Sequence, residues 1–301
     1  MAATIADALC VLQGIVDRGG PEVEDYADLA MSIQTLHEAE FVSENGLSRR
    51  VEPRSEIDQF FAANARTFCT TASFQGFVRC KPHGYAGDFE LIERIYNKSI
   101  SGHADIARWD AFCLLNASTE AVRNRSAVFQ GLVKEVEPEN LLSVACGPGL
   151  DVAAALTAGS SITSATLLDN DPNALRRAAV NLGGTNLDLS YSQANALRCR
   201  PERPQGLIWC SGLFDYLSDR ASVILLRRLY EALKPGGVLA VGNFAEGQTS
   251  RAYMETVGHW LLIHRTEEAI RALAAAAGIP PGRTEVRADE TGVNLFLVAH
   301  A

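Results

Sequence analysis

The stretch that decides the fold is Leu141-Leu-Ser-Val-Ala-Cys-Gly-Pro-Gly-Leu-Asp151. Its apolar first half predicts a buried strand, and residues 146–149 predict a tight turn into a helix that begins at Leu150. Glycine in such a turn lets the backbone approach a ligand closely, because no Cβ is in the way. The turn also directs the first amide groups of the helix toward that ligand. Alone this signal is weak, since any tight strand–helix turn needs the same residues.

A second strand, Thr166-Leu-Leu-Asp-Asn-Asp-Pro172, ends in acidic residues. Asp169 follows the glycine turn by about twenty residues, the spacing at which a carboxylate binds ribose hydroxyls. We therefore expect Asp169 to hold a ribose, with Asn170 as a neighbouring contact. Asp171 directly precedes Pro172, so it is expected to cap the next helix. A capping role is also the alternative for Asp169.

Two further predicted strands end in polar residues. The third ends in Gln193-Ala-Asn-Ala196, where Asn195, beside Ala196, is placed to meet an adenine amino group. The alternative for Asn195 is an ordinary loop amide. The fourth ends at Ser211 and is followed by Tyr216. Because the carboxyl ends of such strands face the ligand crevice, both side chains are expected near a ligand.

The pattern of predicted helices and strands changes near residue 137. Residues 1–137 predict helices without a hairpin, forming a cap and substrate-pocket region, and residues 138–301 predict alternating strands and helices. The alternation implies a parallel sheet that is covered by helices on both faces. The predicted helices are 4–17, 26–41, 57–69, 90–96, 109–136 (with a break near 116–118), 150–158, 172–181, 221–233 and 266–277; the predicted strands are 141–145, 164–168, 187–193, 206–209, 238–244 and an antiparallel pair at 285–287 and 294–299.

The order of these motifs over residues 140–300 resembles the class I S-adenosylmethionine (SAM)-dependent methyltransferases. The resemblance implies a Rossmann-like sheet of seven strands, mostly parallel, that binds SAM across the first two strand ends. Two positions depart from the usual pattern, because Ser143 stands where Asp is common and Ala145 where Gly is common. The implied cofactor contacts come from the residues already singled out and their neighbours: Cys146, Gly147, Gly149, Asp169, Asn170, Asn195, Ala196 and Ser211.

The segment Lys81-Pro-His-Gly-Tyr-Ala-Gly-Asp88 and the residues up to Tyr96 resemble the N-terminal part of a bacterial subgroup of these enzymes. That subgroup includes 3-hydroxypalmitate methyl ester biosynthesis proteins and azetidine-2-carboxylate synthases. The segment is expected either to close over the sulfonium or to dock the cap structurally. Aromatic faces stabilise a sulfonium cation, which makes Tyr85 and Tyr216 catalytic candidates together with Asp88.

The amino-acid end of SAM carries a carboxylate that a guanidinium binds well. Arg123 is the expected partner and Arg125 the other option, both on the helix that leads to the first strand. A solvated helix face is the commoner role for a single Arg.

The composition limits the classes of substrate and partner that this chain is expected to bind. The formal net charge is −9, which argues against nucleic acid as a substrate, because no basic excess exists to release counterions. The seven Cys show no metal-binding spacing, so free thiols and no metal are expected. We expect no signal peptide and no membrane span, hence a cytoplasmic protein that acts on a small molecule.

Three functions compete. The first is methyl transfer from SAM to a small molecule. The second is cyclisation of SAM itself, in which its amino group attacks its γ-carbon to give azetidine-2-carboxylic acid and methylthioadenosine. The third is a SAM-binding regulator without activity. A dehydrogenase is disfavoured, because the turn at residues 146–149 lacks the third spaced glycine of the dinucleotide fingerprint.

Overall fold

The computed structural model describes residues 4–51, 54–201 and 203–301. The chain forms two compact units: residues 1–120 with 247–262, and residues 121–246 with 263–301. The division falls inside helix α8 (Ala117–Val136), and the segment 247–262 belongs to the first unit. The predicted boundary at 137/138 follows the change in sequence pattern. The contacts between residues divide the chain earlier, after Glu120, and add residues 247–262 to the first unit.

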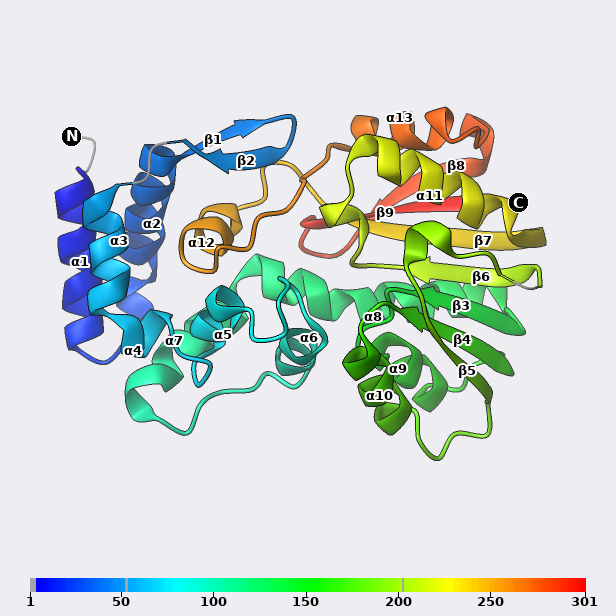
Figure 1. The fold of residues 1–301 in the computed structure, drawn as a ribbon, viewed down its shortest axis with the longest axis horizontal. Coiled ribbons are helices and arrows are strands. Elements are labelled where there is room, and N and C mark those ends of the chain that lie inside the picture. The colour runs from blue at the N-terminus through cyan, green and yellow to red at the C-terminus, as the bar shows by residue number, and fades with distance from the viewer. Residues whose placement is uncertain (1–3, 52–53, 202) are drawn as a thin grey trace. The chain divides into compact units, whose positions relative to one another are not determined.

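The second unit is built on a sheet that has seven strands within the described residues, in the order β5-β4-β3-β6-β7-β9-β8 (Figure 1). Strands β3 to β7 run parallel, and β9 runs antiparallel to both of its neighbours. The predicted mostly parallel sheet with one reversed strand is therefore confirmed. The strands are β3 (Asn140–Val144), β4 (Ser164–Asp169), β5 (Asp188–Gln193), β6 (Gln205–Cys210), β7 (Leu233–Phe244), β8 (Thr284–Ala288) and β9 (Asn294–His300).

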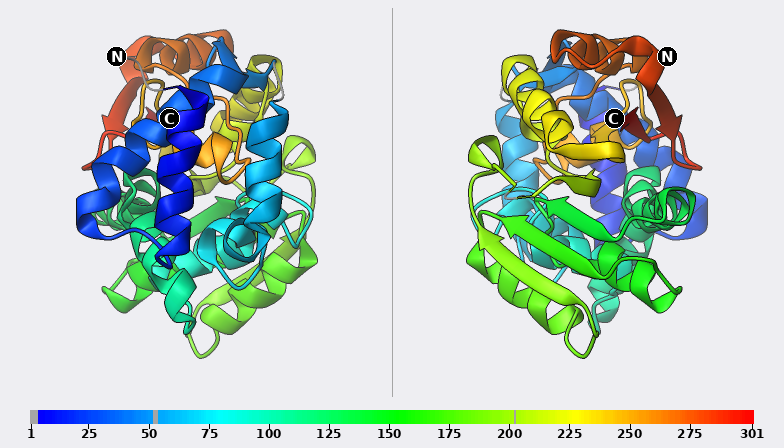
Figure 2. Two further views of the ribbon diagram at one scale, coloured as in Figure 1. Left: turned by 90° about the vertical axis from the view of Figure 1, so that its left-hand side faces the viewer. Right: turned by 90° about the vertical axis from the view of Figure 1, so that its right-hand side faces the viewer.

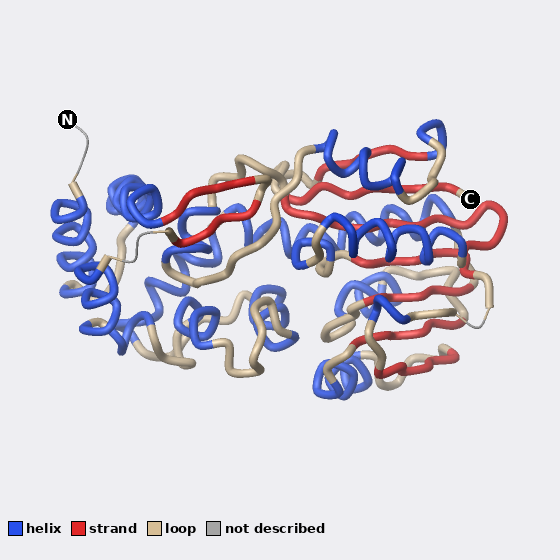
Figure 3. The backbone as a smooth tube through the Cα atoms, turned by 45° about the horizontal axis from the view of Figure 1, so that its top comes forward, coloured by secondary structure: helices blue, strands red, loops and turns tan. Residues whose placement is uncertain are grey.

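Helices cover both faces of this sheet, because neighbouring strand residues point to opposite sides. Leu142 and Ile208 join a core with α11 and α13, whereas Leu141 and Leu207 join a second core with α8, α9 and α10. Figures 2 and 3 show the strands with helices on either side within this unit. The helical elements are α9 (Leu150–Thr157), α10 (Pro172–Asn181), η2 (Ala196–Arg198), η3 (Phe214–Tyr216), α11 (Asp219–Glu231), α13 (Glu267–Ala276) and η4 (Pro281–Arg283).

The predicted elements of this unit match the observed ones closely. The exception is β7, which was expected to begin at Val238 after a turn. It begins at Leu233 instead, and its pairing with β6 shifts register between Gln205 and Leu207. The shift accommodates the Pro-Gly-Gly stretch inside the strand without ending it.

The first unit has a helical core of its own. Apolar side chains of α1, α2, α3 and α7 meet in one buried cluster that includes Leu12, Leu36, Phe61 and Trp109. The helices predicted at 4–17, 26–41 and 90–96 are confirmed, as is the break at Asn116 that separates α7 from α8. The helix predicted at 57–69 is instead two helices that are separated at Asn64, α7 begins at Ala104 and not at residue 109, and α5 and α12 were not predicted. The elements are α1 (Ile5–Asp17), η1 (Val23–Asp25), α2 (Tyr26–Glu40), β1 (Phe41–Glu44), β2 (Leu47–Arg50), α3 (Ser55–Ala63), α4 (Ala65–Phe68), α5 (Phe74–Cys80), α6 (Phe89–Tyr96), α7 (Ala104–Leu115) and α12 (Arg251–Thr256).

The N-terminal region is not all-helical, which corrects the sequence prediction. Strands β1 and β2 form an antiparallel hairpin, with Phe41 paired to Arg50. Asn45 and Gly46 connect the strands with φ of 51° and 77°. Asn-Gly with two positive φ angles is the preferred two-residue hairpin turn, so the sequence did carry this signal. Along the described ranges, no helix combines the length and apolar character needed to cross a bilayer.

Candidate functional site

The turn between β3 and α9 is held in left-handed backbone conformations. Gly147 and Gly149 have φ of 53° and 69°. A Cβ at Gly147 would meet none of the described atoms within 4 Å, whereas a Cβ at Gly149 would lie 3.2 Å from the Cβ of Ala178. Gly149 therefore allows α9 and α10 to pack, and Gly147 leaves space at the ends of the strands.

Asp169 ties the end of β4 to this turn. Its Oδ2 accepts a hydrogen bond from the Gly147 amide at 2.9 Å, and its Oδ1 accepts one from the Asp171 amide at 3.0 Å. The side chain is 7% exposed, and burial raises the pKa of the carboxyl against the effect of these amides. Asp169 does not cap α10. Asp171 does, because its Oδ1 accepts from the Asn173 amide at 2.8 Å.

The thiol of Cys146 lies in the same turn and is half-buried. Burial and the nearby Asp169 raise its pKa well above the ordinary range of a thiol. Cys146 is therefore a neutral thiol at physiological pH. It is suited to packing against a ligand rather than to nucleophilic attack.

The end of β5 lies beside the end of β4, since the Ala194 amide donates to the Asp169 carbonyl at 3.0 Å. Asn195 is exposed and caps the short helix η2, accepting from the Leu197 amide at 2.9 Å. The loop role considered for Asn195 thus exists, and its amide nitrogen is still a donor at this edge. Ala196 is half-buried and Asn170 is exposed.

The end of β6 brings a buried carboxyl to the same edge. Asp215 is 2% exposed, and its Oδ1 accepts from the Phe244 amide at 2.6 Å. Burial raises the pKa of Asp215 to about 6, although the charges of Arg125 and Arg265 lower it. Nearby, Ser211 is half-buried and Tyr216 is 40% exposed.

Arg125 is the most unusual group at this edge. It is 7% exposed, and its Nε has no hydrogen-bond partner among the described residues. Its Cζ lies 5.5 Å from the centre of the Phe244 ring, and a Cβ at Gly212 would lie 2.9 Å from its Nη1. The missing side chain at Gly212 thus admits the guanidinium to the end of β6. Arg123 is half-buried on the same helix.

Arg265 shows how a buried guanidinium is normally satisfied. It is 4% exposed and donates to Asn243 and to the carbonyls of Phe214 and Leu217, as well as to Asp219. Burying a charged group without such partners costs several kcal/mol. Arg125 differs from Arg265 in that its Nε has no hydrogen-bond partner among the described residues.

Asn294 is a further buried polar residue at this edge that the sequence analysis missed. It opens β9 and pairs in register with Phe244, at the carboxyl end of β7. Its side chain is fully buried, and neither amide atom has a hydrogen-bond partner in the described part of the chain. Orphaned buried polar groups are rare in folded proteins. No pattern in the sequence distinguishes Asn294 from an ordinary strand residue.

Tyr85 and Asp88 belong to the first unit. Asp88 is 2% exposed and caps α6, accepting from the Leu91 amide at 2.9 Å, and burial raises its pKa. Asp88 therefore has a local structural role as a helix cap. Tyr85 is 37% exposed.

The cysteines Cys10, Cys69, Cys80, Cys113, Cys146, Cys199 and Cys210 are free thiols. Among the residues with described positions, His, Cys, Asp and Glu side chains form no cluster of three or more that is suited to hold a metal ion.

Comparisons with known proteins point to methyltransferases for part of the chain. Residues 141–237 match the model of a methyltransferase domain. A trans-aconitate 2-methyltransferase from Methylobacterium nodulans is 32% identical over 136 residues, 45% of this chain and 50% of that protein. Another from Methylobacterium radiotolerans is 35% identical over 112 residues, 36% of this chain and 40% of that protein. The chain thus spans about half the length, or less, of these curated relatives.

Solved structures share the fold. A protein from Bordetella parapertussis, described as exported, aligns over 71% of this chain and 79% of its own with a TM-score of 0.60 and 20% identity. A protein from Nostoc punctiforme, described as an O-methyltransferase, aligns over 99% of this chain and 94% of its own with a TM-score of 0.53 and 13% identity. The predicted Rossmann-like methyltransferase fold is confirmed by these likenesses.

Proposed function

We propose that this chain, whose residues 141–237 form a methyltransferase domain, binds SAM at the carboxyl edge of its sheet and methylates a small molecule. The observation that carries the proposal is the contact between the Gly147 amide and the Asp169 carboxylate, at the ends of two neighbouring strands. This hydrogen bond holds the glycine turn and the acid side by side at the strand ends, where sheets of this kind bind nucleotides.

The turn fits an adenosyl group. The space at Gly147 is what a close backbone approach to a ligand requires. A carboxylate has about four lone-pair positions, so Asp169 has acceptor capacity left for ribose hydroxyls after its two amide bonds. Cys146 and Asn170 would flank the same ligand. Beyond them, Gly149 would set the turn, and the edge of β5 with Asn195 and Ala196 would reach the base.

Arg125 fits the carboxylate of SAM. A buried guanidinium without a partner at Nε gains a charge-assisted, bidentate contact when an anionic group arrives. We therefore assign the carboxylate to Arg125 and leave Arg123, the other residue considered, as its neighbour on α8. Ser211 and the amide of Asn294 are further polar groups at this edge for the amino-acid end.

SAM supplies a methyl group on a positively charged sulfur. The acceptor's lone pair forms the new bond to carbon, the C–S pair stays on sulfur, and S-adenosylhomocysteine leaves. A carboxylate acceptor has no proton to lose, whereas a hydroxyl acceptor releases its proton to solvent. The chain's task is to orient the reactants and exclude water. Tyr85 and Tyr216 are candidates to face the cation. Asp88, which already caps α6, would act by positioning the segment that carries Tyr85.

The acceptor is a small molecule in this proposal. The curated relatives are named for trans-aconitate, which makes it the first acceptor to try. Azetidine formation would use the same SAM contacts, but no contact among the described residues favours it over methyl transfer.

One experiment separates these functions. The full chain is incubated with SAM alone, and then with SAM plus trans-aconitate or neutral hydroxylated aromatics, and the products are identified by mass spectrometry. S-adenosylhomocysteine and a methylated acceptor, formed only when an acceptor is present, support the proposal. Methylthioadenosine with a new amino acid from SAM alone replaces methyl transfer by cyclisation. Binding of SAM without turnover across the acceptors indicates a regulator.

A further inference from the structure

Three basic side chains of the first unit, Arg79, Lys81 and His259, form a cluster that includes none of the residues assigned above to SAM. Arg79 lies on α5, Lys81 is the first residue after that helix, and His259 lies three residues after α12. Each of them is half-buried. This basic cluster therefore joins two segments of the first unit that are far apart in the sequence.

Direct contacts hold the two segments of the basic cluster together. The Nη1 atom of Arg79 donates to the carbonyls of Thr256 and Val257 at 3.1 and 2.9 Å. A Cβ at Gly258 would lie 2.9 Å from Cγ1 of Val78, so this segment packs directly against α5. The cluster is thus positioned by backbone hydrogen bonds and close packing, and its charges are not needed to hold the segments in place.

The positive charge of the basic cluster is not balanced by acidic neighbours. Within the described part of the chain, neither Lys81 nor His259 forms an ion pair. The acidic group whose charge acts on His259 is Asp58, and its carboxylate is already bound to Arg50 at 2.8 Å. Arg50 is also paired with Glu40. An incoming anion would therefore meet cations that have no carboxylate of their own.

The ionisation of the three groups reflects this imbalance. Burial lowers the pKa of the Arg79 guanidinium, and the effects of Cys69 and Asp58 only partly offset this. Burial and the charge of Arg79 lower the pKa of Lys81. Burial and the charges of Arg79 and Lys81 lower the pKa of His259 to about 4, so its ring is neutral at physiological pH. A bound anion favours the charged form of each group and so opposes all three shifts.

Two residues of the basic cluster adopt a backbone conformation that disfavours their own side chains. Lys81 and His259 have φ of 47° and 49°, in the left-handed region. Glycine adopts this conformation without strain, whereas a residue with a Cβ does not. Lys81 also ends α5 at a position where helices most often have glycine. Backbone strain of this kind gathers at ligand sites, and here it keeps two basic side chains at one place.

An oxyanion fits the donors of the basic cluster. Both backbone bonds of Arg79 come from Nη1, so its other nitrogens, which the Cys69 side chain approaches, keep donors for a ligand. The Phe61 ring, 4.4 Å from the Cζ atom, supports the plane of this guanidinium. Lys81 adds a second positive charge, and the neutral ring of His259 adds one N–H donor. Carboxylate and phosphate groups are the anions that such a guanidinium binds through two oxygens.

We propose that Arg79, Lys81 and His259 form a binding site for an oxyanion, the carboxylate or phosphate group of a small molecule. The site uses only residues of the first unit. It requires neither SAM nor methyl transfer, so it stands independently of the proposed function.

The first test titrates two ions, inorganic phosphate and the tricarboxylate tricarballylate, separately into the full chain by calorimetry. A buffer of low ionic strength is used, because salt screens charge interactions. Saturable binding of either ion supports the site. Binding of phosphate alone identifies a phosphate group as the ligand, and binding of tricarballylate alone identifies a carboxylate. The absence of saturable binding for both ions overturns the proposal.

Two glycine substitutions locate the binding. Lys81→Gly should weaken binding of the ion about tenfold, the usual contribution of a hydrogen bond to a charged group. Its melting temperature should be unchanged or higher, because glycine suits the left-handed backbone. Lys98→Gly is the matched control: Lys98 is exposed and has a φ of 48°, and its loss should leave the affinity unchanged. Equal affinities in the two variants, or a lowered melting temperature in Lys81→Gly alone, overturn the proposal.

The imidazole of His259 reports on the site directly. The charges that act on it are those of Arg79 and Lys81 beside α5, Arg50 on β2 and Asp58 on α3. Its pKa should rise from about 4 by about one unit when the bound ion is saturating, because a negative charge favours the imidazolium. NMR of the ring Cε1 proton measures it, with the signal assigned by its absence in His259→Gln and chloride at equal ionic strength as control. An unchanged pKa contradicts the proposal.

Calorimetry of Arg125→Met separates this site from the sheet edge of the second unit. Binding of the ion should be unchanged in this variant. Loss of the ion in Arg125→Met, with binding retained in Lys81→Gly, would place the anion at the sheet edge and overturn the proposal. Titration of S-adenosylhomocysteine into the wild type tests the proposed function separately, and its failure to bind would leave the anion site intact.

Discussion

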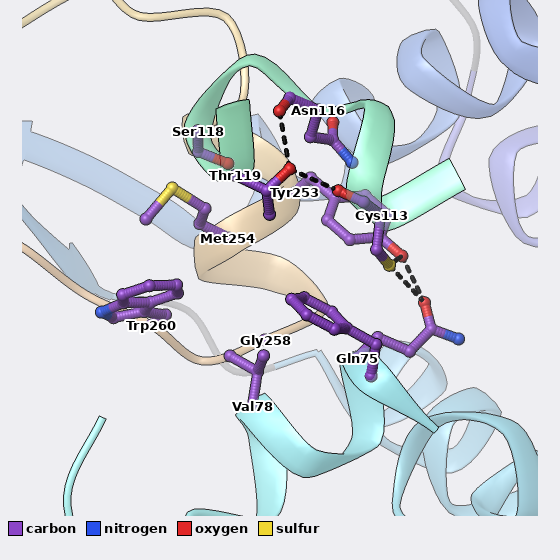
Figure 4. Close-up of a pocket in the computed structure, with 11 residues that line it drawn as sticks. Gln75, Val78, Cys113, Asn116, Ser118, Thr119, Tyr253, Met254, Gly258 and Trp260 are labelled. Carbon is purple, nitrogen blue, oxygen red and sulfur yellow. Dashed lines mark hydrogen bonds between the residues drawn. The ribbon is translucent and has the colours of Figure 1, made fainter. Parts of the chain in front are cut away.

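The carboxyl edge of the sheet and a small pocket of the first unit, which is lined by residues of α5, α7 and the segment 253–260 (Figure 4), differ in charge. At the sheet edge, Asp169, Asp215 and Arg125 are all buried ionisable groups. The pocket has uncharged groups along its lining, and its acidic groups Cys113 and Tyr253 are held neutral by burial.

This difference teaches which of the two regions suits a charged ligand. SAM is charged at its sulfonium, amine and carboxylate, so it suits an edge that offers charges. An uncharged lining offers SAM no such contacts. Each prediction below tests one side of this comparison.

The largest effect is expected from Arg125→Met. Removing the guanidinium should weaken SAM binding by about 100-fold, because truncating one partner of a buried charged pair costs about 2–5 kcal/mol. Methylthioadenosine lacks the amino-acid end, so its affinity should stay unchanged in calorimetry. Arg123→Met is the matched control on α8 and should have a small effect. Equal loss of both ligands would show that Arg125 supports the fold and does not bind the carboxylate.

Asp215 gives the edge a pH dependence that the pocket should lack. Its pKa is raised from 3.8 to about 6 in the folded protein, so the protonated form is favoured by folding. Its contribution to stability is complete below pH 3.8 and is lost as the pH rises through 6, by about 3 kcal/mol in total. Asp215→Asn keeps an acceptor for the Phe244 amide and should remove this loss. Urea unfolding from pH 4 to 8 measures it, and parallel pH profiles of the two proteins would contradict the assignment.

Alanine substitutions at the two glycines of the turn should have different effects on stability and on SAM affinity. Gly149→Ala places its Cβ 3.2 Å from Ala178 at a φ of 69°, and should lower the free energy of unfolding by about 2 kcal/mol. The Cβ of Gly147→Ala would meet none of the described atoms within 4 Å. This substitution should therefore lower the free energy of unfolding by only about 1 kcal/mol, through backbone strain. Its effect on SAM affinity should be the larger of the two, tenfold or more. If Gly147→Ala binds SAM like the wild type, the turn does not contact the ligand.

The smallest effect is expected at Ala145, which adopts a φ of 51°, a left-handed conformation that favours glycine. Ala145→Gly should relieve strain of about 1 kcal/mol, partly offset by the greater freedom of glycine in the unfolded chain. A rise in stability of up to about 1 kcal/mol, with SAM affinity retained, is expected in urea unfolding. A loss of stability would show that the alanine side chain packs usefully in the turn.

The sequence predicted the second unit well because its signals are local. Short strands, most of them apolar, alternate with helices, and the turn after β3 and the acid after β4 stand at a known spacing. The hairpin of the first unit was missed although Asn45-Gly46 is a strong turn signal, because the flanking strands do not alternate in polarity.

The residues that the sequence could not resolve are those defined by tertiary packing. The sequence gives no reason to prefer Arg123 or Arg125, which lie on one helix, and they differ in burial only in the folded structure. Asn294 stands out because its buried side-chain amide has no hydrogen-bond partner among the described residues, and no sequence pattern indicates this. The pocket joins α5 and α7 with a segment more than a hundred residues later, and that segment was left without an assignment.

A crystal structure of the full chain with S-adenosylhomocysteine tests the central claim most directly. We predict the ribose within hydrogen-bond distance of the Asp169 carboxylate, the adenosyl group against Gly147, and the amino-acid carboxylate on the guanidinium of Arg125. Density for the nucleotide at any other place, or an edge that stays closed at saturating ligand, would contradict it.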